Sequence, residues 1–74
     1  MFDKVKELLV DELDISADDI TLDAQLVKDL GINSLELADL VLLCEDNFGI
    51  TIDDSDIHKF VTVGDVVAFI EANK

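Results

Sequence analysis

The first apolar residues of the chain recur at helical spacing. Phe2, Val5, Leu9 and Leu13 fall on one face of a helix. The opposite face carries charged side chains, namely Asp3, Lys4, Glu7 and Asp11. The pattern predicts an amphipathic helix over residues 2–13, with its apolar face toward a core.

The segment from Ser34 to Phe48 predicts a second helix with two apolar faces. Asn33 is a favourable N-cap, and Glu36 stands three residues later, which is the spacing of a capping box. Gly49 follows the last apolar residue, as is typical of a helix end. On a helical wheel, the expected core face holds Leu37, Leu40, Val41, Cys44 and Phe48.

The other apolar stripe of this helix is expected to face solvent. Leu35, Ala38 and Leu42 have the spacing i, i+3 and i+7. Acidic residues surround this stripe: Glu36, Asp39, Glu45 and Asp46. Single exposed leucines are common and need no explanation. Three apolar residues in register beside Ser34 favour a docking surface instead.

The connection over residues 14–33 is unusually long for so small a chain. Such a loop is either functional or pinned to the core, and its recurring apolar residues favour pinning. We expect Leu22, Leu26 and Leu30 to cover one end of the core. Residues 50–52 alternate in polarity, but the chain offers no obvious partner strand, so they predict an extended loop.

Two further helix starts complete the prediction. Asp54 or Ser55 is expected to cap a short helix through residues 57–60. Thr62 and Asp65 have capping-box spacing at the start of a last helix. Its inward residues are Val63, Val66, Val67 and Ile70. The fold class is therefore all-α: a small four-helix bundle with three main helices, one short third helix and a long first loop, forming one domain over residues 1–74.

The charge balance narrows the choice of partners. Eighteen acids against five basic residues give a formal charge of −13. A charge this negative excludes nucleic acid as a partner and favours partners with basic surfaces. It also predicts marginal stability of the fold at low ionic strength. No apolar run is long enough for membrane insertion, and the first residues lack the apolar region of a signal peptide. With one cysteine, the chain is expected to be a cytoplasmic monomer.

The chain offers little material for catalysis. His58 is its one histidine and is expected to be a surface or helix-end residue. Cys44, on the inner face of the second helix, is expected to be a buried small apolar residue. Asp53, Asp54 and Asp56 lack the glycine and glutamate spacing of a calcium loop, so they predict a solvated acidic cluster and no metal site.

Ser34 is the exception, because Asn33 can cap the helix and leave the serine hydroxyl free. A primary hydroxyl at an exposed helix start is accessible to a modifying enzyme. A phosphodiester formed there would lie near the positive end of the helix dipole. The position is therefore suited to a phosphate-linked group.

The sequence resembles the acyl carrier proteins around this serine. Residues 31–40 read Gly-Ile-Asn-Ser-Leu-Glu-Leu-Ala-Asp-Leu and follow Leu-Val-Lys-Asp-Leu at 26–30, whereas the family signature is Asp-Ser-Leu after Asp-Leu-Gly. Further similarity at residues 45–48, 50–57 and 62–66 extends the resemblance over essentially the whole chain. The resemblance implies 4′-phosphopantetheine on Ser34, transferred from coenzyme A by a phosphopantetheinyl transferase. The arm's thiol would hold acyl chains as thioesters for fatty acid synthesis enzymes, while the chain itself would not be an enzyme.

The resemblance also implies two sets of contact residues. The partner-binding set, expected to meet basic docking patches on acyl-processing enzymes, is Leu35, Glu36, Ala38, Asp39, Leu42, Glu45 and Asp46. The acyl-pocket set is Leu40, Cys44, Ile52, Ile57, Phe60 and Val66.

Three positions depart from the family pattern, and two alternative functions stay open. Asn33 replaces aspartate, Leu42 stands where methionine is common, and Cys44 is smaller than the usual leucine. One alternative is a carrier for polyketide or aminoacyl groups. The other is an unmodified acidic module that binds a basic partner.

Overall fold

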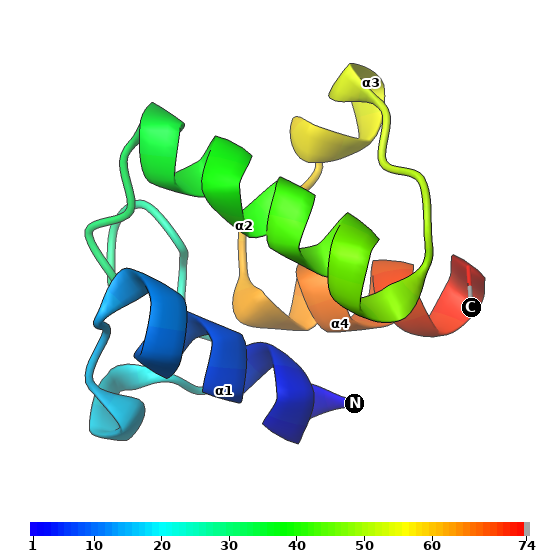
Figure 1. Ribbon diagram of the computed structural model, residues 1–74. Coiled ribbons are helices and arrows are strands. Elements are labelled where there is room, and N and C mark those ends of the chain that lie inside the picture. The colour runs from blue at the N-terminus through cyan, green and yellow to red at the C-terminus, as the bar shows by residue number, and fades with distance from the viewer. Residues whose placement is uncertain (74) are drawn as a thin grey trace.

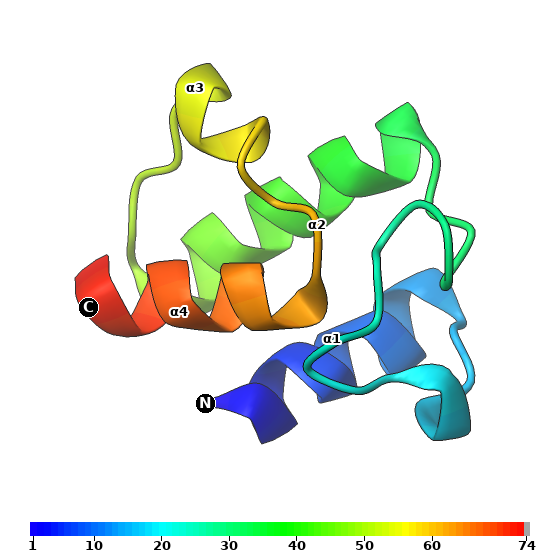
Figure 2. The ribbon, with the colours of Figure 1, turned by 180° about the vertical axis from the view of Figure 1, so that it is seen from behind.

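The computed structural model describes residues 1–73 and confirms the all-α fold. Its helices are α1 (Phe2–Leu13), α2 (Ser34–Phe48), α3 (Asp54–Ile57) and α4 (Val63–Asn73), with a 3₁₀ turn η1 (Ala17–Asp19) in the first connection. Figures 1 and 2 show α4 behind α1 and α2 in one view and in front of them in the other. Three main helices therefore surround the core, and the short α3 crosses beyond one end of it.

The core is built from the apolar faces that the spacing predicts. Val5 and Leu9 of α1 and Leu40, Val41 and Cys44 of α2 are buried. The inward residues of α4 are buried as predicted: Val63, Val66, Val67 and Ile70. Close packing of these side chains supplies most of the favourable free energy of folding.

The first connection is pinned to the start of α4 by backbone hydrogen bonds. The Leu26 N–H donates to the Val61 carbonyl at 2.9 Å, and the Val63 N–H donates to the Ala24 carbonyl at 3.0 Å. An isolated antiparallel bridge pairs Gln25 with Thr62 between these two bonds. The prediction of a pinned loop is confirmed.

The prediction for Leu22 is wrong. Leu26 is fully buried, but the Leu22 side chain is 50% exposed. The Leu22 carbonyl accepts a 2.9 Å bond from the Gly64 N–H, and a Cβ on Gly64 would lie 3.0 Å from that oxygen. This backbone contact directs the Leu22 side chain outward, while Ile20 and Ala24 fill the end of the core.

The start of α3 also differs from the prediction. Asp53, rather than Asp54 or Ser55, is the N-cap residue, and the helix ends at Ile57. The Asp53 N–H donates to the Asp56 carboxylate at 3.3 Å. Of the three acids Asp53, Asp54 and Asp56, the first and the last therefore take part in helix capping.

The capping box at the start of α4 makes stability depend on pH. The Asp65 carboxylate accepts from the N–H groups of Thr62 at 3.0 Å and Val61 at 3.1 Å, and the Thr62 hydroxyl accepts from the Asp65 N–H at 3.2 Å. The Thr62 backbone bond above all lowers the pKa of Asp65 from its usual 3.8. A lowered pKa in the folded state stabilises the fold above about pH 4, and this contribution is lost as the pH falls through that lowered value.

We therefore expect Asp65→Asn to lower the free energy of unfolding at pH 7 by about 0.5 kcal/mol, since an exposed cap is partly screened by solvent. In acid, where the Asp65 carboxylate is protonated, the variant and the wild type should have the same free energy of unfolding. Urea unfolding at several pH values measures it. Asp18→Asn on η1 removes the same charge without a capping bond and controls for reduced repulsion. An Asp65→Asn deficit that is constant down to pH 2 would contradict the role of the charge.

Candidate functional site

Ser34 is the first residue of α2 and is exposed. The predicted capping box is present: the Asn33 Oδ1 accepts from the Glu36 N–H at 2.8 Å, and the Glu36 carboxylate accepts from the Asn33 N–H at 3.2 Å. Gly31, at φ 68°, makes the turn that leads into this cap. Because Asn33 performs the capping, the Ser34 hydroxyl is left at the surface near the positive end of the helix dipole.

A groove of about 400 Å³ opens beside Ser34, between the first turns of α2 and the end of α3. Its lining is mostly apolar and consists of Ser34, Leu37, Ala38, Ile57, His58 and Phe60. The Phe60 ring packs edge-to-face on Phe69 of α4, with 5.4 Å between the ring centroids. The groove wall is therefore held by the core.

Two of these lining residues were not predicted as site residues. The spacing assigned Leu37 to the core, and it is in fact half-buried, with one edge on the groove. His58 ends α3 as its C-cap, as expected of a helix-end residue, but it also faces the groove. No sequence signal identifies either position, because the path of the 50–60 segment decides what lies opposite Ser34.

The outward stripe of α2 faces solvent. Leu35 is 79% exposed and Leu42 is 59% exposed. Ala38, Asp39 and Asp46 are also exposed. These five residues of the predicted partner-binding set form one accessible surface that begins at Ser34.

The other two acids of that set are tied into the fold. Glu36 belongs to the capping box, and it is half-buried. Glu45 is also half-buried, and its carboxylate accepts a 2.8 Å bond from the Ile52 N–H. Glu45 thereby fixes the extended segment after α2. Reversing its charge would disturb this segment as well as any partner contact.

The residues predicted to line an acyl pocket lie mainly within the packed core. Leu40, Cys44 and Val66 are each 1% exposed. Ile52 is buried against the same core, whereas Ile57 and Phe60 reach the groove beside Ser34. Of the six residues, these last two are the ones that connect the surface groove with the interior.

Cys44 is a buried thiol with low reactivity. Burial, with a smaller effect from the charge of Glu45, raises the pKa of Cys44 from 9.0 to about 11. The thiolate fraction at pH 8 is then roughly 100-fold lower than that of a thiol with a pKa of 9.0. We expect alkylation by iodoacetamide to be slow in the folded protein and fast in urea, as followed by intact mass. Rapid labelling without denaturant would contradict the burial of this thiol.

These features define a class of protein: a small helical domain that presents a serine hydroxyl at a capped helix start, beside an apolar groove and an acidic helix face. The sequence model of the phosphopantetheine attachment site, PP-binding, matches residues 3–70. The chain therefore belongs to the phosphopantetheine-binding carrier family. Members of this family carry 4′-phosphopantetheine covalently. Within residues 1–73, none of the helices is long and apolar enough to span a membrane.

Proposed function

We propose that the chain is an acyl carrier protein of fatty acid synthesis, with 4′-phosphopantetheine attached to Ser34. The observation that carries the proposal is the exposed serine at the capped start of α2, in a chain of the phosphopantetheine-binding family. The protein's part is to hold, orient and present the arm to other proteins. When bound, the arm supplies a terminal thiol that holds acyl groups as thioesters.

The surroundings of Ser34 suit such an arm. The first turn of α2 provides the positive end of a helix dipole for the phosphodiester. Leu37, Ile57 and Phe60 offer apolar contact along the adjoining groove. A short acyl chain could pass from the groove into the interior only if α3 moved away from the core, because the core residues Leu40 and Val66 are each 1% exposed and closely packed.

Partner recognition is assigned to the outward stripe of α2. The exposed apolar residues Leu35, Ala38 and Leu42 would make the short-range contact, and Asp39 and Asp46 would attract lysine and arginine patches. Exposed charges at the rim of an interface mainly raise the association rate and make it sensitive to salt. This suits a carrier that must leave each enzyme after transfer. Glu36 and Glu45 would act in part through the fold, by holding the ends of the helix.

The experiment that tests the carrier proposal is intact mass after incubation with coenzyme A and a phosphopantetheinyl transferase. One added phosphopantetheine per chain supports it. No gain with several transferases would favour an unmodified acidic interaction module. The pathway is tested next, by offering the loaded protein to a malonyl transferase of fatty acid synthesis and, in parallel, to an aminoacyl-adenylating enzyme. Loading by the second enzyme alone would overturn the fatty acid assignment.

A further inference from the structure

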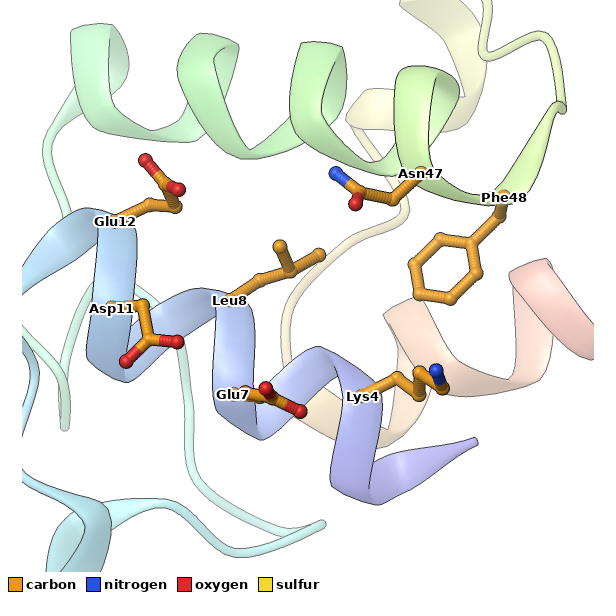
Figure 3. A pocket seen from close by; sticks show the side chains of 7 residues that line it. All are labelled: Lys4, Glu7, Leu8, Asp11, Glu12, Asn47 and Phe48. Carbon is orange, nitrogen blue, oxygen red and sulfur yellow. The ribbon is translucent and has the colours of Figure 1, made fainter.

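A trough runs along the seam between α1 and α2, and Figure 3 shows the first of its two parts. It consists of two adjoining hollows of about 300 and 270 Å³ that share Glu12. One end lies between Lys4 and Phe48, and the other between Leu13 and Asp39. The trough therefore follows nearly the whole length of α1. It shares no lining residue with the groove beside Ser34.

The floor of the trough carries five apolar side chains, and the polar side chain of Asn47 lies among them in the first hollow. Figure 3 shows Leu8 pointing from α1 toward α2 and Phe48 pointing from α2 toward α1. Leu13, Leu42 and Leu43 continue this floor in the second hollow. Leu42 is 59% exposed, and the other four are half-buried. The exposed lining is mostly apolar in the second hollow, whereas in the first it is mostly polar, with Leu8 and Phe48 between polar side chains.

The walls of the trough are strongly acidic. Their carboxylates come from both helices and are those of Glu7, Asp11, Glu12, Asp39 and Asp46. Among the described residues that line the trough, Lys4 is the one basic side chain, and it lies at one end. Leucine and phenylalanine side chains between carboxylates of both helices are complementary to a partner that has an apolar stripe flanked by lysine and arginine.

We propose that the α1–α2 trough is a docking surface for a basic amphipathic helix of a partner protein. Two antiparallel helices leave a groove into which the side-chain ridge of a third helix packs. The 12 residues of α1 span about 18 Å, so an occupant of about 12–15 residues fits, with leucine-like residues at i, i+3, i+4 and i+7. An extended strand would turn some of its backbone groups toward the trough walls. Those groups would find no partner there, because the walls are helices whose own backbone groups are bonded internally.

The α1–α2 trough goes beyond the carrier chemistry and does not depend on it. It joins the outward stripe of α2 through Asp39, Leu42 and Asp46, so one partner could cover both surfaces. It adds contacts from α1, through Leu8, Asp11, Glu12 and Leu13, that the serine site does not require. A partner held in the trough could therefore stay bound whether or not Ser34 is modified.

The test uses the full chain and a synthetic helix of leucine and lysine with leucines at i, i+3, i+4 and i+7. NMR titration should shift the amides of α1 and of the second half of α2. Asp11→Lys with Glu12→Lys should weaken binding about tenfold or more. This pair places lysines in the last turn of α1, where the helix dipole favours them, so the variant should fold.

Two controls separate docking from general charge attraction. Asp18→Lys with Asp19→Lys makes the same charge change on η1, outside the trough, and should alter affinity less than about twofold. A second peptide with its leucines replaced by glutamine keeps the charge and should bind at least about tenfold more weakly. Equal weakening by both lysine pairs, equal binding of both peptides, or shifts confined to the α2–α3 groove would each overturn the proposal.

Discussion

Ser34→Ala should abolish the mass gain with coenzyme A and a phosphopantetheinyl transferase, while the folded structure stays the same. The hydroxyl is the proposed attachment atom, so its removal leaves nothing to modify. The capping bonds at this helix start belong to Asn33 and Glu36 and are untouched by the change. The free energy of unfolding should therefore change by less than about 0.5 kcal/mol. Intact mass and urea unfolding on the same samples measure both effects.

The matched control for this variant is Ser55→Ala. Ser55 is an exposed serine in the first turn of α3 and lies outside the residues that line the Ser34 groove. We expect Ser55→Ala to gain one phosphopantetheine as the wild type does. Continued modification of Ser34→Ala, or loss of modification in Ser55→Ala, would assign the attachment to another residue.

Leu40→Ala should unfold much of the protein at low salt, whereas Leu42→Ala should barely affect it. Both changes remove the same atoms from α2, but Leu40 is 1% exposed and Leu42 is 59% exposed. Truncating a buried leucine costs about 2–5 kcal/mol, which approaches the whole stability of about 3–5 kcal/mol expected for a domain of this size. Truncating the exposed leucine should cost less than about 0.5 kcal/mol. Thermal and urea unfolding compare the two.

Added salt should restore part of the folded population of Leu40→Ala. The formal charge of −13 opposes compaction, and counter-ions screen that repulsion. Magnesium should act at lower concentration than sodium because it carries two charges. Equal destabilisation by the two leucine changes would show that α2 is rotated from the orientation described above, and the outward stripe would then lose its basis.

Local chemistry made both ends of α2 and the start of α4 predictable, whereas the cap of α3 was predicted wrongly. Asn33 with Glu36, and Thr62 with Asp65, satisfy the free N–H groups of their helices through residues three positions apart, so tertiary contacts are not needed to recognise them. Gly49, at φ 65°, ends α2 for a reason equally local. The core faces followed from 3.6-residue periodicity, since each helix must bury its apolar side.

The sequence by itself determined the helices, their inward faces and the exposed serine at the start of α2. It did not determine the lining of the Ser34 groove, the second role of Glu45 or the outward turn of Leu22. These depend on contacts between distant segments: Glu45 with Ile52, and Leu22 with Gly64. Periodicity shows which way a residue faces on its own helix, but the packing of one element against another decides which residues share a groove.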